Sequence, residues 1–359
     1  MRSRSDSSPR RLGASGFKAV WLRFVRLKLL PTAFLAAAFC SFMTIGWSSR
    51  AFADPASLEE LIGAVVKIKT HINPDGNTVR NLGRDREGTG IVIDADGLVL
   101  TIGYLIVEAF AAEVITNDGH AVPATVVGYD HETGFGLLRT LGPLKVKPLA
   151  FGKFADTKEN DNVVVASGGG ADNVARATIV SKREFTAGWE YVLKQAYFTA
   201  PPHPSWSGAA LINREGKLIG VGSLIVGDAS GAKIHMPGNM FVPIDLLMPI
   251  LGDLIVEGHA ASPPRPWLGL TTDESRGRLV VDRVAPGAPA EKAGIQRGDV
   301  IVGINGETPT SLNDFYNKLW SRGEAGVVVA LDVMHNNAVR RIEVKSINRL
   351  QHLKLKSTF

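Results

Sequence analysis

Short strand-like runs recur along residues 65–243 with almost no helical pattern between them, and this feature most limits the possible folds. Turn pairs such as Asp96-Gly97 and Asp118-Gly119 separate several of the runs, since glycine adopts positive φ without steric penalty. Frequent strands without intervening helices predict an antiparallel barrel or sandwich. The runs span residues 65–72, 90–94, 98–102, 112–115, 121–129, 135–139, 162–166, 176–181, 191–199, 209–212, 217–226 and 241–243.

The pattern changes after these strands. Residues 244–257 are typical of a short amphipathic helix, and GHAASPPRP (258–266) is typical of a proline-rich linker. From Trp267 the chain alternates strands with two helices, over 286–294 and 311–319, which predicts a small α/β module. The expected organisation is a leader over 1–53, a mainly β domain over 54–257, a linker over 258–266, an α/β domain over 267–348 and a C-terminal tail over 349–359.

The leader has the composition of an export signal. Residues 1–28 are basic, residues 29–49 are uncharged and mostly apolar, and Ala51-Phe52-Ala53 matches a small-x-small cleavage pattern. The apolar run is also long enough to span a bilayer, so an uncleaved inner-membrane anchor is the alternative to a cleaved signal peptide. Both alternatives place residues 54–359 in the periplasm or cell envelope, with membrane contact only through an uncleaved leader.

The net charge of +5 is concentrated in the leader. Residues 1–53 carry nine Lys or Arg and one acid, whereas the remaining chain carries 31 basic and 34 acidic residues. Nucleic-acid binding by the exported part is therefore not expected. The only cysteine, Cys40, lies in the leader, and the histidines have no metal-binding spacing, so no metal or other cofactor is expected.

The first module carries GTGIVIDADGLVLT (88–101), VVGYDHETGFGLLR (126–139), SWSGAALINREGKLIGV (205–221) and MFVPIDLLMPIL (240–251). These segments resemble the HtrA/DegP family of exported trypsin-like proteases. The second module carries WLGL (267–270) and VAPGAPAEKAGIQRGDVIVGINGE (284–307), which resemble the family's PDZ domain. The resemblance implies a mainly β fold, a chymotrypsin-like double β-barrel followed by a small α/β PDZ domain.

Two of the three catalytic positions implied by the resemblance have changed. Ser207 stands at the nucleophile position, but Tyr104 stands where the family has histidine and Gly134 where it has aspartate. Histidine acts as general base in such a triad, and aspartate orients it. A phenol with a pKa of about 10 is only about 0.1% ionised at pH 7, so Tyr104 is a poor substitute.

The surroundings of Ser207 leave some alternatives open. The backbone N–H groups of Ser205 and Ser207 are the expected remnant of an oxyanion hole, although the family usually has glycine at the first position. His203 and His131 are candidate replacement bases or ordinary loop histidines. Trp206 is either a core residue or a plug in the former substrate pocket.

The PDZ resemblance implies a peptide-binding site. The backbone N–H groups of Leu268, Gly269 and Leu270 would hold the terminal carboxylate of a peptide that adds as a strand. Leu312, Phe315 and Leu319 of the later helix would help to line the groove. The alternative is a domain that docks internally and binds no ligand.

Together these features predict an HtrA-like pseudoprotease that binds peptides or unfolded-protein C-termini, in protein quality control or as the regulator of an active protease. The resemblance also implies self-assembly as a homotrimer, or hetero-assembly with an active relative. The first alternative is an active serine endopeptidase that uses Ser207 with a non-standard base. The second is a structural scaffold of the envelope.

Overall fold

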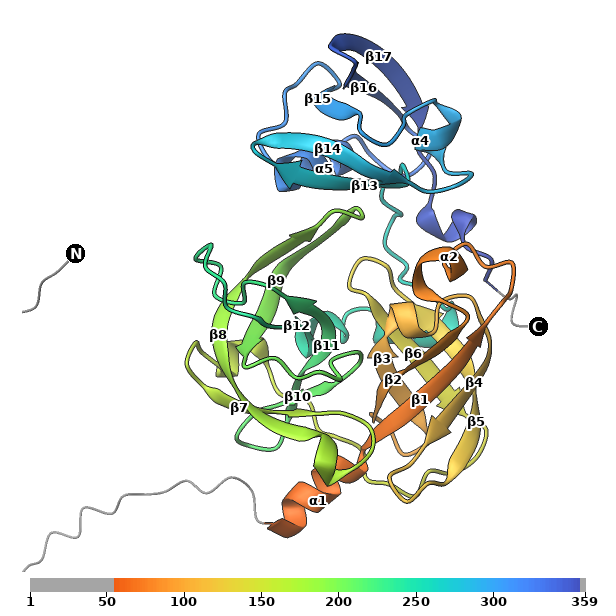
Figure 1. Ribbon diagram of the computed structural model, residues 1–359. Coiled ribbons are helices and arrows are strands. Elements are labelled where there is room, and N and C mark those ends of the chain that lie inside the picture. Colours follow the sequence, from red (N-terminus) through yellow and green to blue (C-terminus); the bar gives the residue numbers. More distant parts are fainter. Residues whose placement is uncertain (1–54, 356–359) are drawn as a thin grey trace, which may run out of the picture. The chain divides into compact units, whose positions relative to one another are not determined.

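The structure is a computed structural model that describes residues 55–355 (Figure 1). The leader, with its apolar run and Cys40, lies outside the described residues, so the signal peptide or anchor stays a prediction. The last four residues of the tail also lie outside them. Within residues 55–355, no helix is long and apolar enough to cross a membrane.

Six antiparallel strands close a first barrel in the order β1-β2-β3-β6-β5-β4. Helix α1 (Pro55–Gly63) precedes it, α2 (Val79–Leu82) lies between β1 and β2, and the 3₁₀ turn η1 (Gly103–Leu105) follows β3. The strands are β1 (Val65–Ile72), β2 (Asp85–Val92), β3 (Leu98–Ile102), β4 (Ala109–Ile115), β5 (Ala121–Tyr129) and β6 (Phe135–Thr140).

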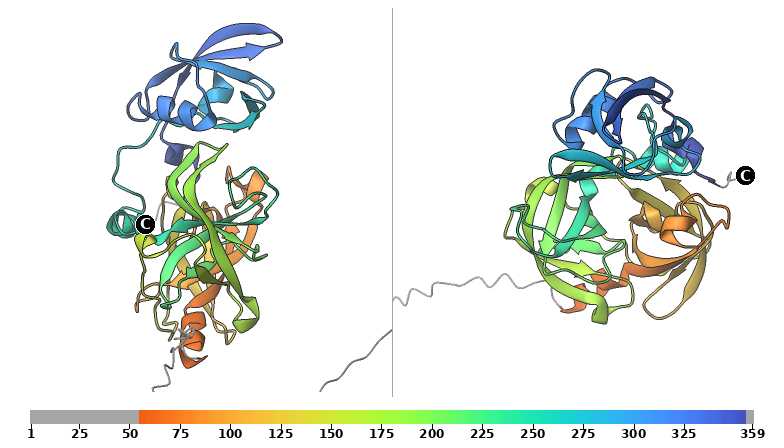
Figure 2. Two further views of the ribbon diagram at one scale, coloured as in Figure 1. Left: turned by 90° about the vertical axis from the view of Figure 1, so that its left-hand side faces the viewer. Right: turned by 45° about the horizontal axis from the view of Figure 1, so that its top comes forward.

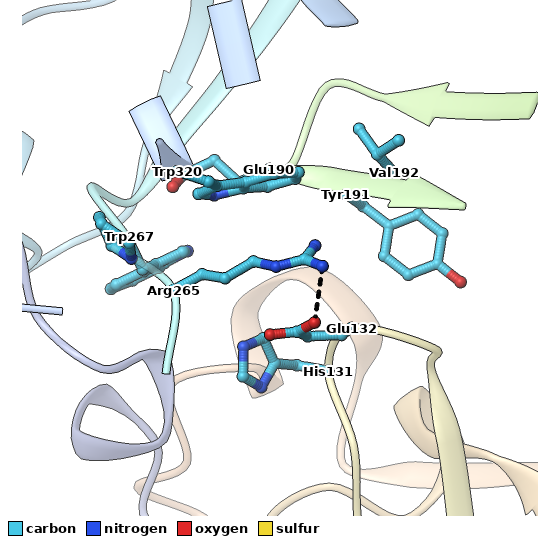
Figure 3. A pocket seen from close by; sticks show the side chains of 9 residues that line it. His131, Glu132, Glu190, Tyr191, Val192, Arg265, Trp267 and Trp320 are labelled. Atoms are coloured by element: carbon cyan, nitrogen blue, oxygen red, sulfur yellow. Dashed lines mark ion pairs between the residues drawn. The ribbon is translucent and has the colours of Figure 1, made fainter. Parts of the chain in front are cut away.

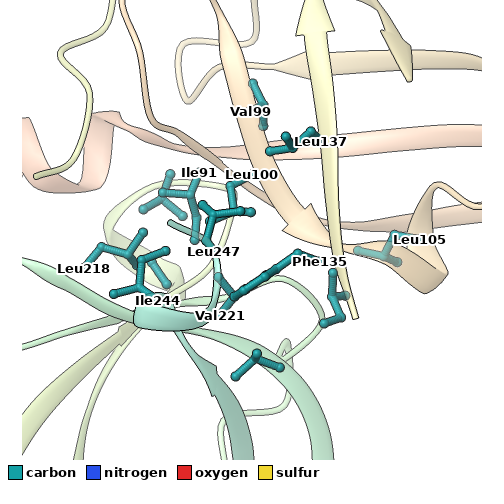
Figure 4. Packing of buried hydrophobic residues seen from close by; sticks show 14 of the residues in the cluster. Ile91, Val99, Leu100, Leu105, Phe135, Leu137, Leu218, Val221, Ile244 and Leu247 are labelled. Atoms are coloured by element: carbon teal, nitrogen blue, oxygen red, sulfur yellow. The ribbon is translucent and has the colours of Figure 1, made fainter. Parts of the chain in front are cut away.

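A second barrel closes in the order β10-β11-β12-β9-β8-β7 (Figures 1 and 2). Its strands are β7 (Asn162–Ala166), β8 (Val174–Ala187), β9 (Tyr191–Ala200), β10 (Ala210–Ile212), β11 (Leu218–Val226) and β12 (Gly238–Pro243). One apolar cluster includes Ile91 and Leu100 of the first barrel and Leu218 and Val221 of the second, all of them buried (Figure 4). The two barrels thus share a core, as the predicted double β-barrel requires.

The third unit is a five-stranded antiparallel sheet in the order β13-β14-β15-β16-β17. Helix α5 begins after Ser311, whose hydroxyl accepts the N–H of Asp314 and so caps the helix. Strand β13 is an edge strand of this sheet. The elements are β13 (Leu270–Ser275), β14 (Arg278–Val284), α4 (Pro289–Lys292), β15 (Val300–Ile304), α5 (Leu312–Trp320), β16 (Val328–His335) and β17 (Ala338–Lys345).

The β8–β9 hairpin is longer than the sequence predicts. Its strands continue to Ala187 and resume at Tyr191, so only residues 188–190 form the tip. Aromatic contacts between the two strands stabilise the extra length of β8, residues 182–187. The Phe185 ring lies 6.3 Å from that of Tyr191 and 6.1 Å from that of Phe198. These contacts are not visible in the local sequence pattern, which indicated a strand only over 176–181.

The predicted helix over 244–257 is wrong in its extent. The structure has a 3₁₀ turn at Ile244–Leu246 and a separate helix α3 at Leu251–Val256. Pro249 lies between them and lacks the N–H that a continuous helix needs. The predicted helix over 286–294 is likewise reduced to α4.

The C-terminal tail returns to the first barrel. After β17 it forms the 3₁₀ turn η5 (Arg349–His352), the carbonyl of His352 accepts the side-chain amide of Asn77 at 2.5 Å, and the N–H of Lys354 donates to Glu108 Oε1 at 2.8 Å. Glu108 is buried and also accepts the backbone N–H groups of Asn77 and Thr78. The tail is therefore attached to the chain just after Tyr104.

Glu108 and the buried Arg86 together hold the Tyr104 turn. The Arg86 guanidinium donates to the carbonyl of Tyr104 at 2.6 Å and to Thr78 Oγ1 at 2.8 Å. Burial lowers the pKa of Arg86 to about 10, and the charge of Glu108 opposes this shift. Burial raises the pKa of Glu108, but the hydrogen bonds from Thr78, Lys354 and Asn77 outweigh it and leave that pKa below its ordinary value.

Replacing Glu108 with alanine is expected to lower the free energy of unfolding by about 2–4 kcal/mol, because the N–H groups of Asn77, Thr78 and Lys354 lose their acceptor and Arg86 loses a nearby negative charge. Urea unfolding measures the loss. The matched control is Glu87→Ala, which removes an exposed pair with Lys69 (3.5 Å) and is expected to cost less than about 1 kcal/mol. Equal small losses in both variants would contradict a supporting role for Glu108.

Candidate functional site

Tyr104 lies against Ser207, as their positions in the sequence predict. The turn η1 presents the phenol, whose oxygen lies 2.9 Å from Ser207 Oγ and 2.9 Å from the carbonyl oxygen of Ser223. A neutral phenol has one hydrogen to donate, and a carbonyl can only accept. Tyr104 therefore fixes the serine hydroxyl in a hydrogen-bonded arrangement without providing a base.

The protonation state of Tyr104 reinforces this conclusion. Burial raises the pKa of the phenol to about 12, although the hydrogen bond with Ser207 lowers it. At pH 7 the ionised fraction is then on the order of 10⁻⁵, two orders of magnitude below that of a free phenol. Ser207 thus has no activating group at the position where a triad needs one.

The backbone at Gly134 disfavours an orienting carboxylate. Its φ is +84°, a conformation that disfavours side chains, and an added Cβ would lie 3.2 Å from Tyr191 Oη and 3.4 Å from Ile102 Cδ1. The Tyr191 hydroxyl donates to the carbonyl of Thr133 at 2.6 Å. A side chain at position 134 would therefore need a left-handed backbone and a close contact with Tyr191.

The predicted oxyanion-hole remnant is only half available, which corrects the sequence prediction. The N–H of Ser205 donates to Nδ1 of His203 at 3.1 Å, and its carbonyl accepts the hydroxyl of Ser167 at 2.5 Å. These bonds direct the Ser205 amide to a side chain of its own loop. Only the N–H of Ser207 remains from the predicted pair.

Neither candidate histidine is hydrogen-bonded to Ser207, although His131 lines the same cleft. His203 is buried, and its backbone is held by the Asn239 amide on both sides, at 2.6 and 3.2 Å. Burial lowers the pKa of His203 and also that of His131. Among the hydrogen bonds of residues 55–355, none joins either imidazole to Ser207.

Trp206 is half-buried and lines the cleft, so of its two predicted roles the position in the core is the one that the structure does not support.

The predicted carboxylate loop holds a carboxylate from the same chain. Glu190, at the tip of the β8–β9 hairpin, accepts the N–H of Leu268 at 3.0 Å, of Gly269 at 2.8 Å and of Leu270 at 2.9 Å. Gly269 has φ +86°, and a Cβ there would lie 2.3 Å from that of Ala288, so the loop shape depends on this glycine. Glu190 itself has φ +58°, an uncommon backbone conformation for a side-chain-bearing residue.

Burial also changes the titration of this carboxylate. Burial raises the pKa of Glu190 to about 7, although the N–H bonds from Leu268, Leu270 and Gly269 and the charge of Arg349 lower it. Figure 3 shows Glu190 near Trp267 and Trp320, beside the ion pair between Arg265 and Glu132 (2.9 Å).

The rest of the hairpin tip contacts β13 and α5. The carbonyl of Gly188 accepts the N–H of Thr272 on the edge strand at 2.8 Å and the hydroxyl of Tyr316 on α5 at 2.6 Å. The N–H of Glu190 donates to the same Tyr316 oxygen at 3.1 Å. The tip thus occupies the strand edge and the helix face that a peptide would use.

Three residues predicted to line the groove are instead core residues. Leu312, Phe315 and Leu319 are buried in the apolar cluster of this domain. Tyr316 of α5 is buried in the same cluster, but its hydroxyl reaches the hairpin tip, a contact that the sequence analysis did not predict. Glu190 was missed because the turn GWEY carries no motif.

Tyr104, Trp206 and Ser207 line a cleft of about 540 Å³, which residues of the WLGL loop also line. A cleft of this size is within the range of small-molecule sites. Among the described residues, no cluster of histidine, cysteine or acidic side chains could hold a metal ion.

Comparisons with known proteins agree with this architecture. A trypsin-like peptidase domain model matches residues 88–221, and a PDZ domain model matches residues 266–346. A probable periplasmic serine endoprotease DegP-like of Halomonas elongata is 27% identical over 271 residues, which cover 72% of this chain and 55% of that protein. The putative serine protease HhoA of Synechocystis sp. is 27% identical over 277 residues, 70% of this chain and 68% of that protein.

The chain spans about half the length of the DegP-like relatives it matches. Among solved structures, the HtrA-type protease AlgW with decapeptide is 20% identical, with a TM-score of 0.48 over 84% of this chain and 99% of that one. Domain order, barrel topology and the two domain matches lead to one assignment. The chain belongs to the HtrA-like proteins, in which a trypsin-like peptidase domain precedes a PDZ domain.

Proposed function

We propose that this protein is a non-catalytic HtrA-like protein of the periplasm or cell envelope that binds protein C-termini through its PDZ domain. Three features of the peptidase domain support the loss of catalysis: a neutral phenol at Ser207, a glycine in a left-handed conformation at position 134, and the diverted amide of Ser205. The relatives' description as periplasmic endoproteases supports the location.

The observation that carries the binding proposal is the carboxylate of Glu190 in the WLGL loop. Three backbone N–H groups converge on it, and a peptide ends in the same chemical group. The edge of β13, where the N–H of Thr272 now donates to Gly188, is the place at which an added strand would pair after displacing the hairpin tip. Glu190 therefore acts as an internal ligand that an incoming C-terminus must displace.

The binding proposal is tested with the purified protein and a fluorescent peptide that ends in an apolar residue. Saturable binding is expected for the free carboxylate and not for the same peptide with an amidated end. Equal binding of both peptides would show that the carboxylate loop does not recognise the ligand.

The raised pKa of Glu190 predicts a pH dependence of stability. The docked pKa of about 7 lies above the ordinary value of 4.5, so docking stabilises the fold fully below pH 4.5 and loses that contribution as pH rises through about 7. Between pH 5 and pH 8, the wild type is expected to lose roughly 2 kcal/mol of unfolding free energy relative to Glu190→Gln. Urea unfolding at both pH values measures this difference, and parallel pH profiles would contradict it.

The same proposal covers the cellular role. A protein that holds C-termini without cutting them would serve protein quality control or regulate an active protease. It would assemble either with itself, as a homotrimer, or with a catalytically active member of the family. The competing proposal is an active serine endopeptidase, which the names of the relatives favour. The neutral phenol beside Ser207 argues against an active endopeptidase. Labelling of the wild-type protein by a serine-directed probe tests this alternative.

A further inference from the structure

The 540 Å³ cleft has an unusual charge distribution. Its lining includes two arginines, Arg283 and Arg349, and no aspartate or glutamate. Three of the chain's six tryptophans, Trp189, Trp206 and Trp267, line it too. Apolar walls combined with cations and no acid suit a ligand that is itself apolar and negatively charged.

The charges of both arginines remain uncompensated by close ion pairs. Arg283 donates to neutral oxygens, Asn81 Oδ1 at 2.9 Å and Thr271 Oγ1 at 3.4 Å. Arg349 donates to the carbonyl of Trp189 at 3.5 Å, and its guanidinium carbon lies 6.0 Å from the ring centre of Trp267. In the described part of the chain, neither guanidinium lies within 4.0 Å of a carboxylate.

The nearby carboxylate of Glu190 does not form an ion pair with either arginine. It influences Arg349 electrostatically, but its oxygens accept three backbone N–H groups of the WLGL loop. Charge-assisted hydrogen bonds from arginine to a carboxylate are stronger than those to neutral oxygens. A ligand carboxylate would therefore replace weaker partners at both arginines.

We propose that the cleft binds a single small molecule with a carboxylate head and a long apolar body, such as an acyl carboxylate. Arg283 and Arg349 bind the head, and the body packs on Trp189, Trp206 and Trp267. The cleft adjoins the carboxylate loop, whose Trp267, Gly269 and Leu270 also line it, but the head group binds the two arginines rather than the backbone N–H groups of the loop. Tyr104 and Ser207 form part of its wall rather than a catalytic centre.

Titration with dodecanoate, followed by tryptophan fluorescence below the micellar concentration, tests the site in the purified protein. Saturable binding is expected, and the Arg283→Gln/Arg349→Gln double variant is expected to bind at least about tenfold more weakly. Dodecanol, which has the same chain but no charge, should bind weakly and equally to both proteins. Arg297→Gln is the matched control, because Arg297 is exposed and pairs with Asp282 at 3.3 Å outside the cleft lining.

Three results would overturn the proposal. Absence of saturable dodecanoate binding would exclude the site, and dodecanol binding as tight as that of dodecanoate would exclude carboxylate recognition. Tighter dodecanoate binding by Glu190→Ala, with no effect of the arginine changes, would place the head group in the WLGL loop. Melting temperatures check that the variants are folded, and the comparison of dodecanoate with dodecanol in the wild type decides the question independently of them.

Discussion

Replacing Glu190 with alanine is expected to tighten the binding of a carboxyl-terminal peptide by at least about tenfold. The reason is that a ligand's apparent affinity falls with the fraction of protein whose site is open, and Glu190 keeps the carboxylate loop filled. Removing the side chain deletes three hydrogen bonds of the closed state while leaving the loop donors intact. Fluorescence anisotropy with wild type and variant measures the change.

Glu184→Ala is the matched control for this variant. Glu184 lies on the same hairpin and bonds Asn313 of α5 at 2.7 Å, but it does not contact the WLGL loop. Hydrogen exchange of the Leu268–Leu270 amides without peptide gives an independent readout, which should rise in Glu190→Ala only. Equal peptide affinity in all three proteins would exclude competition by Glu190, whereas no binding in any of them would exclude the proposed function.

Replacing Tyr104 with histidine is expected to make Ser207 reactive. An imidazole ordinarily titrates near neutrality and can accept the serine proton, whereas the phenol with its pKa of about 12 cannot. Labelling by a fluorophosphonate probe should rise from background by about 10²–10⁴-fold, the usual contribution of general base catalysis. Ser207→Ala in the same background should abolish the labelling.

Adding Gly134→Asp to this variant is expected to give little further gain. The backbone at φ +84° disfavours an aspartate, and its Cβ would lie only 3.2 Å from Tyr191 Oη. Labelling of the wild-type protein, lost in Ser207→Ala, would contradict the non-catalytic proposal. A large gain from Gly134→Asp would contradict the steric argument.

The sequence predicted the barrel strands, the small α/β module and the positions of Tyr104 and Ser207 in one site, because strand alternation and family spacing report on backbone topology. Three kinds of feature escaped it. Pro249 interrupts a predicted helix because it lacks a backbone N–H. The N–H of Ser205 is hydrogen-bonded to His203 Nδ1, a local contact that the sequence pattern does not reveal. The placement of Glu190 depends on hairpin length, and aromatic contacts between distant residues determine that length.

The attachment of the C-terminal tail to Asn77 and Glu108 has a consequence for ligand competition. The PDZ domain is tethered twice, by its linker before Trp267 and by the tail after Ile347. A hairpin tip released from the carboxylate loop therefore stays close to it, at an effective concentration on the order of millimolar. An external C-terminus must be either abundant or strongly complementary to the groove to compete, which sets a threshold that weak, incidental chain ends do not pass.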